Sequence, residues 1–371
     1  MRIRIIGILI LALSLASCRK SGCTNPDALN YDAKAKVDDG SCVCTTSSSG
    51  PTPYQLNIPA TFARFLPAPT IPVDNPMTVE GVALGKKLFF DPQLSADNTL
   101  ACAGCHFPQY SFDDTSRFSV GIDGIAGDRN AMPIFNHAWN QNGKFFWDGR
   151  ATKLEDQVLL PISNHIEMGL DDKQLLEAKI EGSPMYKDLF ANAFANGEIS
   201  SENIGKALAN FVASIISYNT KFDRVNRKED TYTPLETKGK ELFDSKYQCI
   251  SCHGGNNLNS TWGGSDFANI GLSSELDPNS TNGNLFKVPS LRNVAVTGPY
   301  MHDGSINSLE KVIDHYSTGM KMNSAMDWRL QNFASNGGMN ITKEEKEALI
   351  AFLKTLTDHQ MLSNQKWSNP F

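Results

Sequence analysis

The spacing of hydrophobic residues predicts helices over most of the chain. Around residue 210, apolar side chains recur every three or four positions and fall on one helical face: Ile204, Leu208, Phe211, Val212 and Ile215. Near the C-terminus, Thr342 and Glu345 form a capping-box pattern, and an apolar stripe follows it: Leu349, Phe352, Leu353 and Leu356. Few segments alternate with a period of two, so the predicted fold class is all-α.

Two distant segments share one pattern, which indicates an internal repeat. Residues 84–90 read LGKKLFF and precede the motif Cys102-Ala103-Gly104-Cys105-His106. Residues 238–243 read KGKELF and precede the motif Cys249-Ile250-Ser251-Cys252-His253. Each copy predicts a short helix, a loop and then Cys-x-x-Cys-His. Two domains of one type, over residues 84–228 and 229–371, account for the length of 371 residues.

The N-terminus has the pattern of an export signal. Arg2 and Arg4 precede an apolar stretch from Ile5 to Ala16, which is too short to span a membrane. Residues 15–18 (LASC) resemble a bacterial lipobox, which predicts a lipoprotein signal peptide over residues 1–17 and a lipid anchor on Cys18. An ordinary signal peptide followed by a stray cysteine is the alternative. Export predicts a periplasmic protein in an oxidising compartment, tethered to a membrane.

A small polar segment and a proline-rich strap follow the signal. Cys23 and Cys42 bound most of residues 18–50, and we expect a Cys23–Cys42 disulfide that leaves Cys44 as an odd thiol. The aspartates of this segment suit either a calcium site or a solvated tether, and the composition favours the tether. Seven prolines from Pro51 to Pro76 predict that residues 51–83 begin as an extended strap.

Composition narrows the class of protein. Hydrophobic residues make up 40% of the chain and charged residues 20%, as in an ordinary globular protein. The net charge of −6 argues against a nucleic-acid partner, because proteins that bind nucleic acids carry basic faces.

The motif Cys-x-x-Cys-His is the signature of covalent attachment of haem c. Two thioethers hold the porphyrin edge, and the imidazole of the next residue reaches the iron. A redox dithiol or a zinc site also uses two cysteines at this spacing, but neither requires the adjacent histidine. We therefore predict two haem c groups, attached through Cys102 and Cys105 and through Cys249 and Cys252. The proximal iron ligands are His106 and His253.

A haem iron with two protein ligands transfers electrons, whereas an iron with an open sixth position can bind peroxide. The sixth ligand of each iron therefore decides between electron transfer and catalysis. Packing or surface roles are the default expectation for the remaining histidines, and spacing alone does not identify a ligand among them: His137, His165, His302, His315 and His359.

Longer motifs between Leu84 and Asp358 show a family resemblance. The chain resembles the bacterial di-haem cytochrome c peroxidase/MauG family through residues 84–92 (LGKKLFFDP), 129–130 (RN), 146–151 (FWDGRA), 167–168 (EM), 286–293 (FKVPSLRN) and 298–304 (GPYMHDG). This resemblance implies two class I-like cytochrome c domains in tandem. It also implies that peroxide reacts at the N-terminal haem and that electrons enter at the C-terminal haem. Dimers are common in the family, so a homodimer is a further expectation.

The resemblance also assigns roles to residues. Trp147 matches the tryptophan between the haems, where an indole bridges electron transfer; an ordinary core tryptophan is the alternative. Glu167 and Gln157 match the distal pocket of the peroxide haem, with Pro161 and Phe146 in its wall. A carboxylate within reach of both peroxide oxygens can move the proton that O–O cleavage requires. Asn130 and the carbonyls of Thr297 and Pro299 match the calcium site that lies between the domains in this family.

The sequence departs from the classical peroxidases at the peroxide haem. In those enzymes the loop before the Arg-Asn pair carries a histidine that blocks the resting haem. Here this loop, residues 119–128, reads SVGIDGIAGD and contains no histidine. The sequence therefore predicts an open peroxide haem in the oxidised protein, with His137 as the alternative plug.

A second departure concerns the C-terminal haem. Tyr316 stands where the classical family has an axial methionine and where MauG has a tyrosine. Tyrosinate is a hard anionic ligand that stabilises oxidised iron. Met320 and Met322 are alternative ligands, and a packed tyrosine without an axial role is a third possibility.

These observations predict a di-haem peroxidase that reduces hydrogen peroxide to water. Its electrons would come from a small periplasmic cytochrome c or cupredoxin and pass from the C-terminal haem through Trp147. Oxidation of a protein substrate, as in MauG, is the first alternative. A di-haem electron carrier without catalytic activity is the second.

Overall fold

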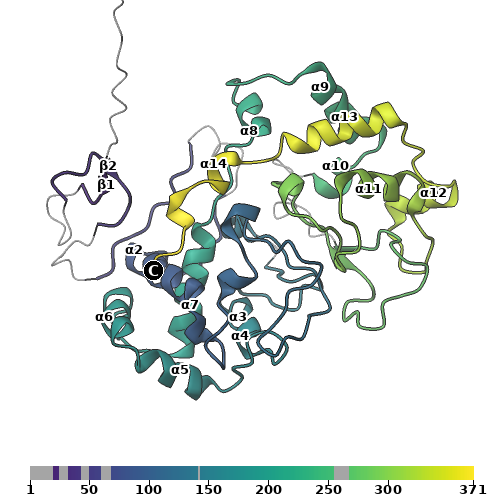
Figure 1. The fold of residues 1–371 in the computed structure, drawn as a ribbon. Coiled ribbons are helices and arrows are strands. Elements are labelled where there is room, and N and C mark those ends of the chain that lie inside the picture. Colours follow the sequence, from purple (N-terminus) through teal and green to yellow (C-terminus); the bar gives the residue numbers. More distant parts are fainter. Residues whose placement is uncertain (1–19, 25–31, 43–49, 60–67, 141–142, 255–266) are drawn as a thin grey trace, which may run out of the picture. The chain divides into compact units, whose positions relative to one another are not determined.

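The computed structural model describes residues 20–24, 32–42, 50–59, 68–140, 143–254 and 267–371. The chain forms two compact units, Met1–Ser49 and Gly50–Phe371. Helices dominate the larger unit (Figure 1), as the sequence predicts. They are α2 (Val79–Phe90), α3 (Leu154–Gln157), α4 (Leu160–Ser163), α5 (Lys173–Glu181), α6 (Pro184–Ala193), α7 (Ser201–Ser214), α8 (Lys221–Asn226), α9 (Pro234–Glu241), α10 (Ile250–His253), α11 (Leu309–Asp314), α12 (Trp328–Ser335), α13 (Lys343–Lys354) and α14 (His359–Leu362).

Short strand pairs are a minor addition to this helical fold. In the smaller unit, β1 (Ser21–Gly22) pairs in parallel with β2 (Val37–Asp38), and Ser21 lies opposite Val37. In the larger unit, β3 (Phe267–Ala268) pairs antiparallel with β4 (Phe286–Lys287), and Phe267 lies opposite Lys287. Pairs of two residues are too short to form a sheet core, so the helices provide the hydrophobic packing.

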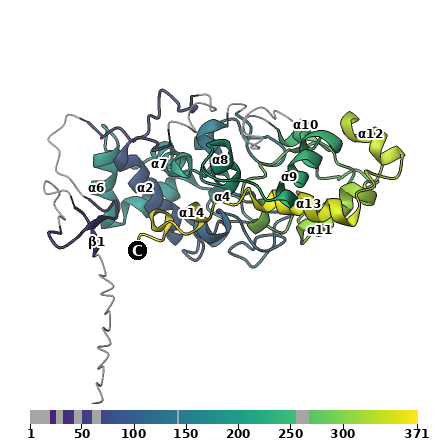
Figure 2. The same ribbon diagram turned by 90° about the horizontal axis from the view of Figure 1, so that it is seen from above.

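The internal repeat appears as two matching helix pairs. α2 packs against α7, and α9 packs against α13 (Figures 1 and 2). Each pair crosses at a glycine in the repeated motif. A Cβ atom on Gly85 would lie 1.9 Å from the Ala207 carbonyl oxygen, and one on Gly239 would lie 1.9 Å from that of Ala348. Only glycine lets the two backbones approach this closely.

Replacing Gly239 with alanine is therefore expected to reduce stability by about 1–3 kcal/mol, because the α9–α13 crossing must open to admit the methyl group. Chemical denaturation of Gly239→Ala tests this expectation. Gly127→Ala is the control, since a Cβ there would meet its nearest atom at 3.8 Å. Equal midpoints for Gly239→Ala and the unsubstituted protein would show that the crossing tolerates a methyl group.

Two hydrophobic clusters correspond to the two copies of the repeat. The first contains the contact between Phe89 and Phe211, whose ring centroids lie 5.1 Å apart. The second contains Phe243 and Phe352, at 5.3 Å. The C-terminal tail returns to the first cluster, where buried Trp367 packs on Phe211. The last residues of the chain therefore stabilise the N-terminal core.

A network of buried polar groups joins the two halves. Arg292 makes a bidentate ion pair with Asp223, at 2.8 and 2.6 Å, and both side chains are 1% exposed. The Asp358 carboxylate accepts hydrogen bonds from the Ser217 hydroxyl and from the Tyr218 and Asn219 backbone amides. These bonds tie the segment after α7 to the C-terminal tail.

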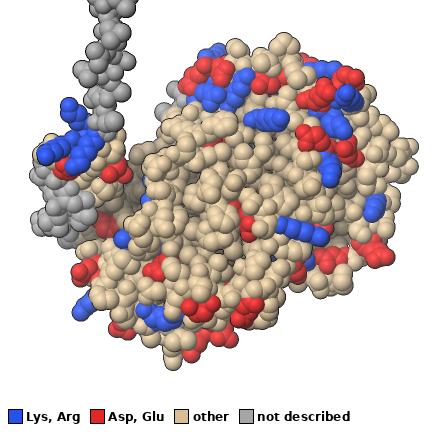
Figure 3. Space-filling model, viewed as in Figure 1, with Lys and Arg blue, Asp and Glu red and all other residues tan. Residues whose placement is uncertain are grey.

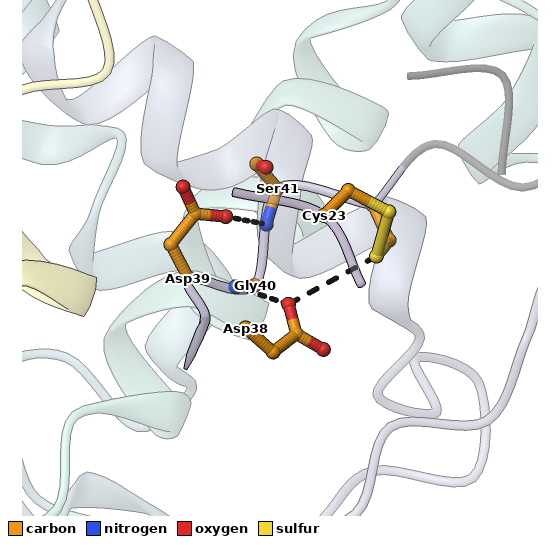
Figure 4. The surroundings of a disulfide bond; sticks show 6 residues. Cys23, Asp38, Asp39, Gly40 and Ser41 are labelled. Carbon is orange, nitrogen blue, oxygen red and sulfur yellow. Dashed lines mark hydrogen bonds between the residues drawn. A yellow bond between two sulfur atoms is a disulfide. The ribbon is translucent and has the colours of Figure 1, made fainter. Parts of the chain in front are cut away.

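The smaller unit contains the predicted disulfide between Cys23 and Cys42, which confirms this pairing. Asp38 and Asp39 accept hydrogen bonds from the Gly40 and Ser41 backbone amides, each at 3.0 Å (Figure 4). Each carboxylate therefore uses one oxygen to accept a hydrogen bond from the backbone of the turn in which it lies. Cys18 and Cys44 lie outside the described residues, as does the predicted signal peptide.

Among the described residues, no helix is long and apolar enough to cross a membrane. On the face of residues 50–371 that Figure 3 shows, acidic and basic side chains are interspersed. This face therefore lacks the basic patch expected of a nucleic-acid-binding protein.

Candidate active site

The first Cys-x-x-Cys-His motif forms a tight turn. The Cys105 and His106 amides both donate to the Cys102 carbonyl, at 3.2 and 3.0 Å. His106 Nδ1 lies 2.8 Å from the Phe112 carbonyl oxygen. Because a carbonyl oxygen only accepts hydrogen bonds, Nδ1 carries the proton and the Nε2 lone pair is available to iron. Desolvation lowers the His106 pKa, which favours this neutral form.

The second motif repeats this geometry on α10. The Cys252 and His253 amides donate to the Cys249 carbonyl, at 3.2 and 2.9 Å. His253 Nδ1 donates to the Pro289 carbonyl oxygen at 3.1 Å, so its Nε2 is again the atom available to a metal. Desolvation lowers the His253 pKa to about 4, and the imidazole is therefore neutral at pH 7.

A cavity of about 1030 Å³ opens beside the second motif, with Cys249, Cys252 and His253 in its wall. Its volume lies at the upper end of the roughly 300–1,000 Å³ typical of ligand pockets. Apolar side chains dominate the rest of the lining, including Val288, Leu291, Val294, Leu309, Ile313, Phe333 and Leu353. Two thiols, an imidazole with a free Nε2 and an apolar enclosure of this size fit a covalently bound haem.

Tyr316 lies in the wall of this cavity, which we call the second cavity because it adjoins the second motif. It occupies a π-helical turn (His315–Gly319) that continues α11, a local geometry frequent at functional sites. Desolvation raises its pKa, and the nearby Cys249 and Cys252 groups raise it further. Neither of the two alternative methionines lines this cavity. Met320 packs with Met326 and Leu330, and Met322 is exposed.

Glu167 lies near the first motif. Burial raises the pKa of the Cys102 and Cys105 thiols, and the nearby Glu167 carboxylate raises both further. Asn164 Nδ2 donates to Glu167 Oε1 at 2.7 Å and fixes the orientation of the side chain. Desolvation raises the Glu167 pKa above its ordinary value, although the Asn164 hydrogen bond opposes this effect. A half-buried carboxyl group with a raised pKa suits proton transfer.

The other expected pocket residues belong to the same part of the chain. Gln157 is the last residue of α3, and its side-chain amide makes no hydrogen bond to the described residues. The Pro161 carbonyl accepts the Met168 amide at 3.3 Å, which ties α4 to the segment carrying Glu167. Phe146 adopts a left-handed backbone conformation, with φ at 65°, and the Arg150 guanidinium stacks on its ring.

The loop that lacks a histidine packs directly against the Glu167 segment. Residues 120–126 form a narrow hairpin in which the Gly121 amide donates to the Ile125 carbonyl. The Ile122 amide donates to the Glu167 carbonyl oxygen at 3.0 Å. A Cβ atom on Gly121 would lie 1.7 Å from the Ile166 carbonyl oxygen, so this contact requires glycine.

Trp147 lies between the two halves of the larger unit. Its indole Nε1 donates to the Asn130 carbonyl at 2.8 Å, and its own carbonyl accepts the Lys287 amide at 2.7 Å. The residue also lines the second cavity. Contacts from both halves therefore hold the indole beside the second haem site.

The candidate calcium ligands belong to two segments, one of which pairs with the turn after the other. The buried Asn130 donates its backbone amide to the His302 carbonyl at 2.9 Å, which places it beside the turn that contains Pro299. Asn130 Nδ2 donates to the Ser116 and Arg117 carbonyls. In the described structure, Asn130 Oδ1 and the carbonyls of Thr297 and Pro299 accept no hydrogen bond, so these oxygens are available to a cation.

The five remaining histidines have varied surroundings. His165 and His359 are exposed, and His315 Nε2 donates to the Ile270 carbonyl at 3.0 Å. His302 stacks on Phe286, with ring centroids 3.5 Å apart. His137 packs on Phe145, and desolvation lowers its pKa to about 3, so it is neutral at pH 7.

Sequence reasoning missed two residues at these sites. Asn164 orients Glu167 and precedes it by three residues, but no motif in the sequence identifies it. Lys287 stands between Phe286 and Val288 in the FKVPSLRN motif, and a charged residue between two apolar ones is the only local signal that marks it.

Comparison with known proteins agrees with this geometry. The family model for di-haem cytochrome c peroxidase matches residues 79–231, and the cytochrome c model matches residues 236–357. The methylamine utilization protein MauG of Methylorubrum extorquens is 35% identical over 339 residues, covering 86% of this chain and 92% of that protein. The cytochrome c peroxidase Ccp of Escherichia coli is 35% identical over 288 residues, covering 72% and 60%.

A solved structure shows the same arrangement. The crystal structure of a MauG-like protein associated with microbial copper homeostasis matches with a TM-score of 0.77 and 31% identity, covering 85% of this chain and 99% of that one. The sequence comparisons and the structural comparison together show that the protein is a two-domain c-type cytochrome. The chain belongs to the di-haem cytochrome c peroxidase/MauG family and is an oxidoreductase that carries covalently bound haem c.

Proposed function

We propose that this protein reduces hydrogen peroxide to two molecules of water at the N-terminal haem, consuming two electrons and two protons. The observation that supports this most directly is Glu167, a half-buried carboxyl group with a raised pKa beside Cys102 and Cys105. An electron carrier without catalytic activity has no use for such a group. A small periplasmic cytochrome c or cupredoxin would supply the electrons.

Glu167 would act as the acid and base of this reaction. Cleavage of the peroxide O–O bond requires one oxygen to lose a proton and the departing oxygen to gain one. A carboxylate that reaches both atoms takes the first proton and delivers the second. The Asn164 bond holds Glu167 in place, and the side-chain amide of Gln157 would orient peroxide or a water molecule.

Electrons would enter at the C-terminal haem and pass through Trp147. The indole lines the second cavity, and its Nε1 bond to the Asn130 carbonyl anchors it to the N-terminal half. A calcium ion held by Asn130 Oδ1 and by the Thr297 and Pro299 carbonyls would stabilise the same junction. Carbonyl and amide oxygens are the hard ligands that Ca²⁺ prefers.

Oxidation of a protein substrate, the MauG-like alternative, is favoured by one specific observation. Tyr316 lines the second cavity beside Cys249 and Cys252, whereas neither Met320 nor Met322 lines it. We infer that Tyr316 would supply the sixth ligand of the C-terminal haem. An anionic tyrosinate would let this haem hold an oxidising equivalent and pass it to a protein at the surface.

Replacing Tyr316 with methionine is expected to raise the reduction potential of the C-terminal haem by tenths of a volt, within the roughly 0.8 V range that axial ligands span. A spectroelectrochemical titration measures this shift. Tyr300→Phe is the control, because Tyr300 lines the same cavity but donates its hydroxyl to the Val294 carbonyl. An unchanged potential and spectrum in Tyr316→Met would exclude Tyr316 as a ligand.

Export and anchoring complete the proposal. The signal-like residues 1–17 and the LASC sequence support attachment to a bacterial membrane through lipid on Cys18. The disulfide-bonded segment from Cys23 to Cys42 would then connect the anchor to the catalytic unit in the periplasm. Mass spectrometry of the mature N-terminal peptide tests for the lipid.

Steady-state assays test the main proposal. Reduced cytochrome c or cupredoxin, mixed with hydrogen peroxide and the haem-loaded protein, should be oxidised at two equivalents per peroxide. No oxidation with any small donor would remove peroxide reduction as the function. If a protein substrate were then oxidised in its place, the MauG-like alternative would stand.

A further inference from the structure

Lys287 is a buried lysine at the junction of the two halves. Its side chain belongs to β4, is 8% exposed and lines the cavity of the C-terminal haem. Its ammonium group donates to the Lys144 carbonyl at 2.6 Å. Within the described part of the chain, it forms no ion pair with a carboxylate. Burial of an ammonium group without a counter-ion opposes folding, so a residue of this kind points to a function.

The contacts of Lys287 converge on the hairpin of residues 144–151, in which Phe145 pairs with Ala151. Its backbone amide donates to the Trp147 carbonyl at 2.7 Å, while its side chain binds Lys144, three residues earlier. The same lysine therefore holds both ends of the segment 144–147. This segment is short and bent, because Phe146 adopts a left-handed conformation and the Phe145 amide pairs with the Ala151 carbonyl.

Other groups around the ammonium make the contact specific. Asn140 Nδ2 also donates to the Lys144 carbonyl, at 3.0 Å, so two donors fix this oxygen. The ammonium lies 5.9 Å from the centre of the Phe145 ring. Burial lowers the His137 pKa, and the nearby ammonium lowers it further. Burial lowers the Lys287 pKa to about 8, so the side chain remains mostly charged at neutral pH.

We propose that Lys287 is a positioning residue for electron transfer between the haems: through the Lys144 carbonyl and the Trp147 backbone, it fixes the indole that bridges the two sites. This inference rests on the proposed route through Trp147. Within the described residues, the indole makes one hydrogen bond, to the Asn130 carbonyl, so the position of the hairpin backbone also determines where the indole lies. Lys287 restricts this backbone from the opposite half of the molecule.

The experiment compares the rate of electron transfer in variants of the full haem-loaded protein. The protein is reduced by one electron and mixed with hydrogen peroxide, and reoxidation of the C-terminal haem is followed by stopped-flow absorption. Lys287→Met removes the ammonium and keeps an unbranched apolar side chain in place of the lysine stem. Lys144→Met is the matched control, because it removes an exposed ammonium from the same hairpin and leaves the Lys144 carbonyl in place.

Lys287→Met is expected to slow the transfer by about ten- to a hundredfold, since displacement by about 1 Å can cost a hundredfold. Lys144→Met should match the unsubstituted protein. The midpoint potentials of both haems are measured for every variant. A shifted potential with an unchanged transfer rate would show that Lys287 acts as a charge on the haem and would overturn the proposal.

A double-mutant cycle with Trp147→Phe separates this inference from the route itself. If Lys287 acts through the indole, Lys287→Met causes little further slowing in the Trp147→Phe background. Equal slowing in both backgrounds would overturn the positioning role and leave the route intact. Unchanged transfer in Trp147→Phe alone would overturn the route and the inference together.

A milder variant keeps the test usable if Lys287→Met fails to retain both haems. Lys287→Gln keeps a hydrogen-bond donor that is one atom shorter, so slowing intermediate between the unsubstituted protein and the Trp147→Phe variant is expected. A rate equal to that of the unsubstituted protein would overturn the proposal.

Discussion

Replacing Glu167 with glutamine is expected to slow peroxide turnover by about 10²–10⁴-fold, the usual contribution of a positioned acid or base. Glutamine keeps the size of the side chain and can still contact Asn164, but it cannot accept and return a proton. Both haems should remain attached, because Cys102, Cys105 and His106 are unchanged. Steady-state peroxide assays, normalised to haem content by absorption, measure the effect.

Glu181→Gln is the matched control for this substitution. It makes the same chemical change at the exposed end of α5 and should leave turnover unaffected. Turnover of Glu167→Gln within twofold of that control would mean that another group moves the proton.

The raised pKa of Glu167 also sets the direction of a pH effect. Desolvation raises the pKa of this carboxyl group above its usual range. As the pH falls through this raised value, the carboxylate becomes protonated and can no longer accept the first proton of peroxide. The acidic limb of the turnover profile should therefore lie at a higher pH than an ordinary glutamate would give, and Glu167→Gln should lack this limb.

Replacing Arg292 with methionine is expected to reduce the free energy of unfolding by about 3–5 kcal/mol. The substitution leaves the Asp223 carboxylate 1% exposed without its guanidinium partner. Asp223 would keep its hydrogen bonds to Thr220, the N-cap of α8, but these neutral donors do not replace a bidentate ion pair. Chemical denaturation followed by circular dichroism measures the change.

The double variant Arg292→Met, Asp223→Asn is the informative comparison. It removes both charges, so it should recover a substantial part of the lost stability. Lys206→Met serves as the surface control. It breaks an exposed pair with Glu202 at i, i+4, which is worth about 0.3–0.5 kcal/mol. If Arg292→Met and Lys206→Met cost the same, the buried pair would not be a stabilising contact between the halves.

Local patterns in the sequence predict much of the molecule because their causes are local. Covalent chemistry requires two cysteines and a histidine at fixed spacing, so the motifs at Cys102 and Cys249 identify the haem sites directly. The Gly85 and Gly239 repeats predict matching helices, and the capping box at Thr342 predicts where α13 begins. The sequence also predicts the Cys23–Cys42 disulfide, from cysteine number and export.

Contacts between distant segments could not be predicted in this way. No pattern near Arg292 names Asp223 as its partner, and nothing local places Trp367 in the N-terminal core. Lys287 reaches Lys144 only because the two halves pack together, so its role depends on tertiary structure. The strands of two residues are equally invisible, since so short a segment has no periodicity.

Mixing the fully oxidised, haem-loaded protein with one equivalent of hydrogen peroxide tests the central claim most directly. The loop at residues 119–128 has no histidine to block the N-terminal haem, and Tyr316 lies where it can stabilise an oxidised C-terminal haem. The account predicts an immediate change in the visible and near-infrared absorption spectrum with no added reductant. Absence of any change until one electron is supplied per protein would contradict it and show that the peroxide site is closed in the resting state.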